Sequence, residues 1–359
     1  MIPPRKALDL MVYKTISDIA AQSAMVIETN NLRGGGGGLF AAVQSLERLL
    51  CLLQTQTLPL TFLAEVIITH DGIAPEVCAR LQAKYPFQLK FVTIDQLNGY
   101  YSAKNLGFLA VSSKCRYVVF ADSDCIPTPP WLEQLLQPFM AEPDLAVVAG
   151  RTTYQDSLFG AALSTIDFKY YPNPKYPNST RNFYANNVVF QRDVFTKFAY
   201  PTLDKTYRGH CQVLGLALEQ AGVEMRYVSR AHTIHRLPDT FKELLQLRWL
   251  RGQDTCSLTP FLVKRHLPKW MQWFARTGPI APLLILSLRL WFSLAALNHQ
   301  DLTAQKGCRR FAAYIGIFSI SALDMFGAFV RGLGWSALPQ GNGDTLALSY
   351  HHATKENMD

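Results

Sequence analysis

The amino-acid sequence predicts an α/β protein with a doubly wound, mostly parallel sheet, followed by a C-terminal helical extension. Four strand-length apolar segments alternate with three helix-length segments between residues 24 and 121. These strand segments are continuously apolar, which is expected of strands that are buried on both faces of a sheet. Beyond residue 255 the chain instead contains two long apolar segments.

The elements of the first half follow from hydrophobic periodicity. Apolar residues at helical spacing indicate helices, and short unbroken apolar runs indicate strands. The predicted elements, in chain order, are strand 24–27, helix 39–53, strand 64–69, helix 74–84, strand 89–94, helix 103–112 and strand 116–121. Because the connections are short, right-handed crossovers and parallel pairing are favoured.

The segment 131–236 predicts a mixture of helices and short strands. The strands are expected at 146–149, 188–190 and 225–228. The Pro- and Tyr-rich loop from Tyr170 to Thr180 is interpreted as a mobile or substrate-covering loop, since long loops without structure of their own often serve that purpose.

Composition narrows the choice of partners and compartment. The 359 residues carry a formal net charge of +8, and 49% of them are hydrophobic. A basic chain favours an anionic partner, but the sequence contains no Arg-rich helix or zinc-finger spacing, so nucleic acid is not expected. Seven cysteines without a Cys-x-x-Cys pair favour reduced thiols. We therefore expect a cytoplasmic protein, or one at the cytoplasmic face of a membrane.

The C-terminal extension contains two apolar segments, Ile280–Leu297 and Phe311–Val330, each near the length that crosses a bilayer. Arg289 and Asp324 interrupt them and are costly in a membrane unless they are paired. A basic loop between the segments opposes a simple spanning hairpin. Three interpretations stay open: helices on a membrane surface through 280–330, a spanning hairpin, or a soluble helical subdomain.

The acidic tripeptide Asp122-Ser123-Asp124 follows the fourth predicted strand directly. Two carboxylates at a strand end supply the oxygen ligands that Mn²⁺ or Mg²⁺ prefers and leave positions open for a phosphate. The alternative interpretation is a solvated acidic turn that closes the strand.

Residues 100–132, with the Lys104-Asn105 pair and the Asp-x-Asp tripeptide, resemble family 2 glycosyltransferases of the GT-A fold. The resemblance extends over about residues 24–255. It implies a GT-A-like sheet, a Mn²⁺ or Mg²⁺ cofactor, and inverting transfer from a nucleotide-sugar donor, with a UDP-sugar favoured. The acceptor implied is a carbohydrate or lipid-linked molecule, in polysaccharide, glycolipid or envelope glycan synthesis.

The resemblance also implies a division of the chain. The expected parts are an N-terminal arm 1–23, a glycosyltransferase domain 24–255 with a nucleotide-binding half 24–130 and an acceptor half 131–255, an apolar helical extension 256–338 and a polar tail 339–359.

On the donor side, the resemblance assigns residues to the nucleotide and to the metal. The nucleotide residues implied are Glu28, Thr29, Asn31, Asp71, Lys104, Asn105 and Asp122. The metal ligands implied are Asp122, Asp124 and His235. Asp71 is equally interpreted as a turn residue before a glycine, and His235 as an ordinary hydrogen-bonded histidine at a strand end.

On the acceptor side, Asn186, Asn187 and Trp249 are the implied binding residues. Trp249 ends a motif similar to Gln-x-x-Arg-Trp that is one residue short here, and Arg248 or Arg251 is expected to contact phosphate.

The catalytic base departs from the family pattern. The usual Glu-Asp pair is replaced by His210 and Cys211. His210 is the predicted base, because an imidazole accepts a proton at neutral pH, and Asp204 is a second candidate. Because the acid pair is missing, a non-catalytic protein that binds a nucleotide-sugar is an alternative function. A nucleotidyltransferase is a second alternative.

Overall fold

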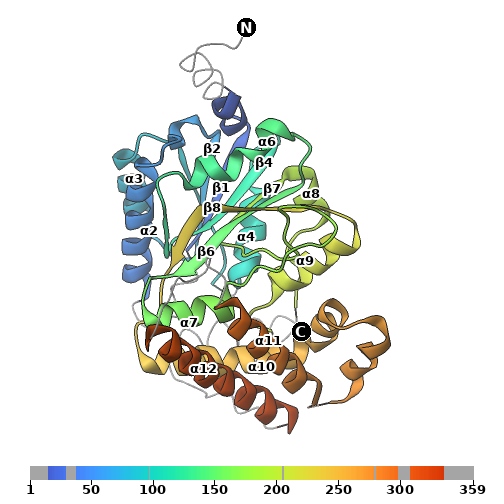
Figure 1. The fold of residues 1–359 in the computed structure, drawn as a ribbon. Coiled ribbons are helices and arrows are strands. Elements are labelled where there is room, and N and C mark those ends of the chain that lie inside the picture. Colours follow the sequence, from blue (N-terminus) through green and yellow to red (C-terminus); the bar gives the residue numbers. More distant parts are fainter. Residues whose placement is uncertain are drawn as a thin grey trace.

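The computed structural model describes residues 15–29, 38–96, 98–203, 206–278, 280–297 and 308–334. Within them, a sheet flanked by helices forms one end of the molecule, and the C-terminal helices gather at the other end (Figure 1). Asn31, Asp204 and the predicted polar tail lie outside the described residues.

The described strands form one sheet of eight strands in the order β3-β2-β1-β4-β7-β6-β8-β5. Their bounds are β1 Ser23–Glu28, β2 Glu65–His70, β3 Leu89–Thr93, β4 Tyr117–Asp122, β5 Cys125–Pro127, β6 Val147–Tyr154, β7 Asn187–Gln191 and β8 Met225–His235. Strands β3, β2, β1 and β4 are mutually parallel, β7 is antiparallel to both neighbours, and β8 is parallel to β6. The predicted α/β class is confirmed, with a more mixed second half.

The helices cover both faces of this sheet and create two cores. Their bounds are α2 Gly38–Gln54, α3 Pro75–Lys84, α4 Tyr100–Leu109, α5 Trp131–Leu136, α6 Pro138–Ala141, α7 Leu158–Asp167, α8 Arg192–Lys197 and α9 His210–Gln220, with a short 3₁₀ helix η2 at Leu60–Phe62. On β1, Met25 and Ile27 enter one core, whereas Ala24 and Val26 enter the other. This alternation explains why the strand is apolar throughout.

Four further helices make up the C-terminal part: α10 Phe241–His266, the 3₁₀ helix η3 Lys269–Arg276, α11 Ile280–Ala296 and α12 Cys308–Gly332. Helix α10 passes without a break through residues 255–256, where the sequence predicted a domain boundary. Gly252 of α10 lies against α12, where a Cβ atom would stand 2.2 Å from the carbonyl oxygen of Asp324. Helices α10 and α12 are therefore closely packed against each other.

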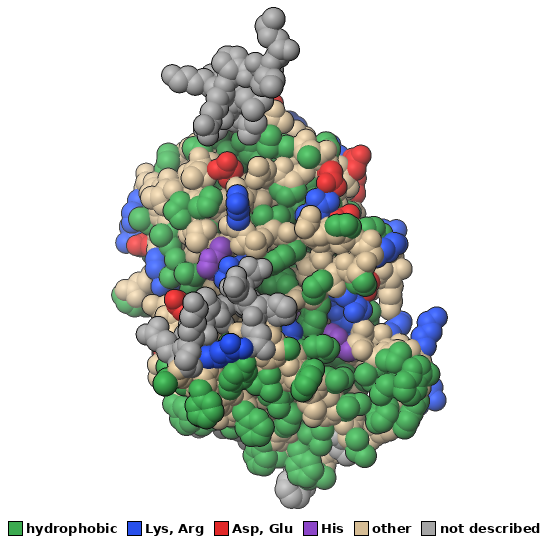
Figure 2. Space-filling model, in the orientation of Figure 1, with side chains coloured by type: hydrophobic (Ala, Val, Ile, Leu, Met, Phe, Trp, Pro, Cys, Tyr) green, Lys and Arg blue, Asp and Glu red, His purple; other side chains and the backbone are tan. Residues whose placement is uncertain are grey.

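Among the described residues, Arg310–Gly332 is the one stretch long and apolar enough to cross a membrane, and α11 is shorter. The inner face of α12 packs against α10, α7 and α11. The outer face and its surroundings carry exposed aromatic side chains, which form an apolar area at the lower end of the molecule (Figure 2). They include Trp270, Trp273, Trp291, Phe311, Phe318 and Phe326.

The loop from Tyr170 to Thr180 is fastened to the sheet. The Tyr170 hydroxyl donates to the carbonyl of Gly150 at 2.6 Å, and the Thr180 N–H donates to the carbonyl of Met225 at 2.8 Å. These contacts argue against a mobile loop, because both ends of the loop are tied to strands, and they leave the substrate-covering interpretation open.

Candidate active site

A cavity of about 180 Å³ opens beside the ends of β4 and β8. Its lining comes from those strand ends and from α4, α7, α9, α10 and α11, so it reaches from the sheet to the C-terminal helices. Asp122 and His235, both predicted as metal ligands, line the cavity. A site at the carboxyl ends of strands is where ligands of open α/β sheets bind.

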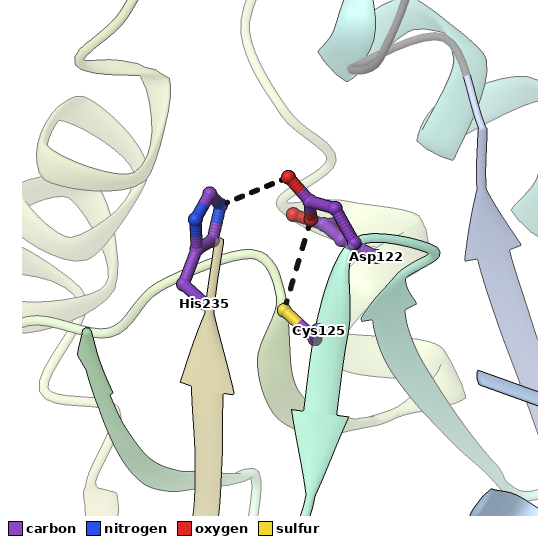
Figure 3. Close-up of side chains that lie close together, drawn as sticks. Asp122, Cys125 and His235 are labelled. Carbon is purple, nitrogen blue, oxygen red and sulfur yellow. Dashed lines mark hydrogen bonds and ion pairs between the residues drawn. The ribbon is translucent and has the colours of Figure 1, made fainter. Parts of the chain in front are cut away.

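Four potential metal-binding side chains meet at this edge: Asp122, Asp124, Cys125 and His235. Figure 3 labels Asp122, Cys125 and His235 at the ends of their strands. The ligand atoms of the four side chains all lie within 4.8 Å of one another. The Nε2 atom of His235 lies 3.6 Å from Oδ2 of Asp124, and the thiol of Cys125 lies 3.9 Å from Oδ1 of Asp124. Asp124 and His235 are thus brought together from opposite halves of the sequence, at the spacing of a shared cation.

The tautomer of His235 suits a metal ligand. Its Nδ1 atom lies 2.9 Å from the carbonyl oxygen of Arg236, which accepts a hydrogen bond from it. The Nε2 atom, directed toward Asp124, is then the nitrogen that a cation would contact, and a hydrogen bond on the second nitrogen is the usual device for orienting a metal-bound imidazole.

Cys125 was missed by the sequence analysis, although it directly follows the acidic tripeptide. Burial raises the pKa of its thiol well above the ordinary value, and the neighbouring Asp124 carboxylate adds to this shift. A protonated thiol is a poor ligand for a hard cation, so the two carboxylates and the imidazole are the better donor set.

Lys104 supports this group of potential metal ligands from inside the fold. We call Asp122, Asp124, Cys125 and His235 the metal cluster. Its ammonium group is completely buried, lies 2.6 Å from Oδ1 of Asp122 and donates to the carbonyl of Ala121 at 2.9 Å. The Tyr100 hydroxyl donates to both oxygens of Asp122, at 2.9 and 2.8 Å. Lys104 therefore positions Asp122, which differs from the predicted direct contact with the nucleotide.

The remaining donor-side residues occupy the ends of neighbouring strands. Glu28 ends β1, Thr29 follows it and Asp71 follows β2, and all three are buried. The Thr29 hydroxyl donates to the carbonyl of Thr69 at 2.7 Å, which ties these two strand ends together. They share one sheet edge with Asp122, as parallel pairing requires.

Two predicted binding residues have structural contacts instead. The amide of Asn105 exchanges hydrogen bonds with the backbone of Tyr200, at 2.9 and 3.2 Å. Asn187 is fully buried; it accepts from the Trp131 indole at 2.8 Å and donates to the carbonyls of Arg151 and Ala231. Both amides satisfy buried backbone or indole groups, and these hydrogen bonds do not support the ligand contacts that the sequence predicts for them.

The other two residues predicted to bind the acceptor, Asn186 and Trp249, lie in different places. Asn186 lines the cavity, and its side-chain oxygen accepts from the Thr152 hydroxyl at 3.1 Å. Trp249 does not line the cavity; its ring lies 5.6 Å from that of Phe326 on α12, so it packs the C-terminal helices together. This packing against α12 does not support the predicted acceptor contact of Trp249.

The predicted base, His210, lies behind the cavity wall. Its ring stacks on Tyr101 with the centroids 4.0 Å apart, and burial lowers its pKa to about 3. An imidazole with so low a pKa is a weak base at neutral pH. Cys211 does line the cavity, but burial raises the pKa of its thiol to about 12. The prediction that His210 is the base is not supported by this environment.

Asp254 of α10 is a cavity-lining carboxyl group that the sequence analysis missed. Burial raises its pKa to about 7, although it accepts hydrogen bonds from the N–H groups of Tyr207 at 3.0 Å and Arg208 at 2.9 Å. Asp167 also lines the cavity, but Arg248 and Arg251 beside it hold the pKa of that carboxyl below its usual range despite burial. Asp254 is thus the carboxyl group here whose pKa suits base catalysis near pH 7.

Arg248 is not available to a phosphate, contrary to one prediction. It is 1% exposed and lies between Asp167, at 2.9 Å, and Asp324 of α12, at 2.6 Å. Asp324 also contacts Arg289. The two charges that the sequence placed in apolar segments are therefore paired with each other and with Arg248.

The class of protein follows from this sheet and its site. Residues 41–198 match the model of the family described as Glycosyl transferase family 2. The resemblance found in the sequence is thereby confirmed, and the matched segment runs from α2 to the end of α8, with the acidic tripeptide inside it.

Individual proteins with a similar sequence share only a modest identity with this chain. Two curated proteins, the pre-mycofactocin glycosyltransferases of Mycobacterium tuberculosis strains CDC 1551 / Oshkosh and ATCC 25618 / H37Rv, are each 26% identical over 282 residues, which is 77% of this chain. The chain spans 57% of the length of these curated relatives.

Among solved structures, a mannosyltransferase from Pyrobaculum calidifontis in complex with GDP-Man and Mn²⁺ is similar, with a TM-score of 0.54 and 15% identity. The match covers 91% of this chain and 95% of that one, so the similarity in fold includes the C-terminal helices.

Proposed function

We propose that this protein is a metal-dependent glycosyltransferase that moves a sugar from a nucleoside-diphosphate sugar to an acceptor hydroxyl with inversion. The observation that carries the proposal is the meeting of Asp122, Asp124 and His235 at the end of a GT-A-like sheet, beside a cavity large enough for a sugar. The family match over residues 41–198 supports the same class of reaction.

Asp124 and His235 would hold the cation, with Asp122 fixed beside them by Lys104 and Tyr100. Mn²⁺ fits this donor set better than Mg²⁺, because Mg²⁺ strongly prefers an all-oxygen shell. Bound there, the cation would stabilise the negative charge that develops on the departing diphosphate.

Asp254 would accept the proton of the acceptor hydroxyl as that oxygen attacks the sugar. Its pKa of about 7 leaves a large part of it ionised at neutral pH while keeping it basic enough to take a proton. Attack from the cavity side, opposite the departing diphosphate, inverts the configuration at the sugar carbon.

The donor class is supported by the names of similar proteins. The Pyrobaculum enzyme binds GDP-Man and Mn²⁺, and the mycobacterial relatives are described as acting on pre-mycofactocin. For this chain we propose a nucleotide-sugar donor and favour a UDP-sugar. We propose that the acceptor reaches the cavity from the side of the C-terminal helices.

We further propose that η3, α11 and α12 lie on the cytoplasmic face of a membrane. Trp270, Trp273 and Trp291 are 58–74% exposed there, and Lys269 and Arg276 flank them. Exposed tryptophans beside basic residues are typical of helices at a membrane interface.

Release of free nucleoside diphosphate from a panel of UDP- and GDP-sugars, with Mn²⁺ or with a chelator, tests the proposal. Metal-dependent release of the diphosphate is the expected result. Release of pyrophosphate would indicate a nucleotidyltransferase, and tight donor binding without turnover of any donor would indicate a binding protein.

A further inference from the structure

Three arginine side chains share two buried carboxylates where the cavity meets the C-terminal helices. Arg248 lies between Asp167 and Asp324, while Arg251 contacts Asp167 and Arg289 contacts Asp324. Three guanidinium groups thus share two carboxylates. We call these five residues the arginine cluster; by itself it carries one excess positive charge.

Lys169 adds a further basic group to the same cavity. Its side chain lines the cavity, the residue is 7% exposed, and its ammonium nitrogen has no hydrogen-bond partner among the described residues. The nitrogen lies 4.8 Å from the ring centre of Phe292 and 5.4 Å from that of Tyr171. Burial, together with the nearby Arg289, lowers the pKa of this ammonium group to about 7.

Contact with aromatic rings does not by itself explain why the amino group of Lys169 is buried. Lys175, in the same loop, also lies over a ring, 4.9 Å from the centre of Tyr176, but it is exposed to water. An ammonium group has three donors, and burying it without an acceptor is costly. The Nε atoms of Arg251 and Arg289, which also line the cavity, likewise lack an acceptor among the described residues. Three basic side chains that line one cavity therefore each hold a buried donor without an acceptor among the described residues.

We propose that Lys169, Arg251 and Arg289 bind an anionic group, a phosphate or a carboxylate, that is part of the acceptor. The wall beside them is apolar, with Ile285, Leu286, Leu288 and Phe292 of α11. The acceptor that fits carries its anionic group next to an apolar portion. This inference rests on the proposed function, in which the metal cluster neutralises the donor diphosphate and the second group of cations is left for the acceptor.

Binding of simple amphiphiles to the full-length protein tests the site. The probes are dodecyl phosphate, dodecanoate, dodecanol and inorganic phosphate, each titrated by calorimetry below its micelle concentration. The variant Lys169→Met keeps the apolar stem and removes the charge, and Lys175→Met is the matched control in the same loop.

We expect Lys169→Met to bind the better of the two anionic amphiphiles roughly tenfold or more weakly, since hydrogen bonds to charged groups contribute strongly. Lys175→Met should bind it as the unchanged protein does. The stronger probe then identifies phosphate or carboxylate. If Lys169→Met binds the anionic amphiphile as tightly as the unchanged protein does, the proposed anion site is wrong. It is also wrong if dodecanol binds as tightly as the anionic amphiphiles. Inorganic phosphate binding as tightly as dodecyl phosphate would overturn the apolar portion of the acceptor.

Binding of UDP with Mn²⁺ separates this inference from the proposed function. Lys169→Met should retain it, and its thermal unfolding midpoint should be equal or higher, because a buried unpaired charge is removed. If Lys169→Met instead loses UDP binding and retains the amphiphile, the cations belong to the donor site and the inference is wrong. If the anion site behaves as expected but no donor is turned over, the proposed function fails and the anion site stands.

Discussion

The metal cluster and the arginine cluster are both buried charged groups, but they are assembled differently. In the metal cluster, Asp122, Asp124 and Cys125 lie within four consecutive residues, at the end of a strand whose apolar run is visible in the sequence. In the arginine cluster, Arg248 joins partners 76 and 81 residues away. The first cluster is encoded locally, whereas the second exists only after the C-terminal helices have packed on α7 and α10.

The largest effect expected is on the metal cluster, from Asp124→Ala. Loss of a ligand should reduce metal-dependent release of nucleoside diphosphate by roughly a thousandfold, the equivalent of several kcal/mol of charge stabilisation. Asp144→Ala is the matched control, because the side chain of Asp144 is 96% exposed and distant from the cluster. Turnover by Asp124→Ala close to that of the control would show that the two carboxylates close a strand and nothing more.

The sequence predicts the locally encoded metal cluster better than the contacts between distant parts of the chain. The parallel strands, the acidic tripeptide and the approach of His235 could be predicted, because strand ends in one sheet meet at one edge. The contacts of Asn105 and Asn187 could not, since each satisfies a group far away in the sequence. The motif in which a polar residue occurs does not predict which buried group will be its hydrogen-bond partner.

Asp254 shows a second limit of sequence-based prediction. It sits in the middle of a long helix with no motif around it, and its raised pKa comes from burial among elements that meet only in the folded chain. His210 shows the reverse: its position in the motif indicated a base, whereas stacking on Tyr101 and burial make it a weak one.

Asp254→Asn tests the acceptor half and should have the next largest effect. Removing a general base should lower kcat for transfer about a hundredfold while leaving binding of the donor nearly unchanged. His210→Phe, which keeps the stacking on Tyr101, should leave kcat within about a factor of three. If His210→Phe loses activity and Asp254→Asn keeps it, the assignment of the base reverts to the one that the sequence indicated.

Asp324→Asn tests the packing of the C-terminal helices through the arginine cluster. It leaves Arg248 and Arg289 with one carboxylate fewer in a buried setting, and about 3–5 kcal/mol of unfolding free energy should be lost in urea titrations. Asp239→Asn, which removes an exposed partner of Arg236, should cost less than about 1 kcal/mol. Similar costs for the two variants would mean that the buried cluster contributes no more than a surface ion pair.

The smallest effect concerns the apolar area, tested by the double variant Trp270→Ser/Trp291→Ser. Its partition onto vesicles of phosphatidylcholine and phosphatidylglycerol should fall several-fold in a sedimentation assay, because two interfacial anchors are lost. Phe40→Ser, a change on the exposed face of α2, should sediment like the unchanged protein. Equal sedimentation of all three would exclude these tryptophans from membrane contact.

The most direct test of the central claim is a titration of Mn²⁺ followed by electron paramagnetic resonance, with and without UDP. We expect one Mn²⁺ to bind per chain, to bind more tightly when UDP is present, and to be lost in Asp124→Ala. The central claim would be contradicted by Mn²⁺ binding that is unchanged in Asp124→Ala, or by UDP binding that is equally tight in a chelator.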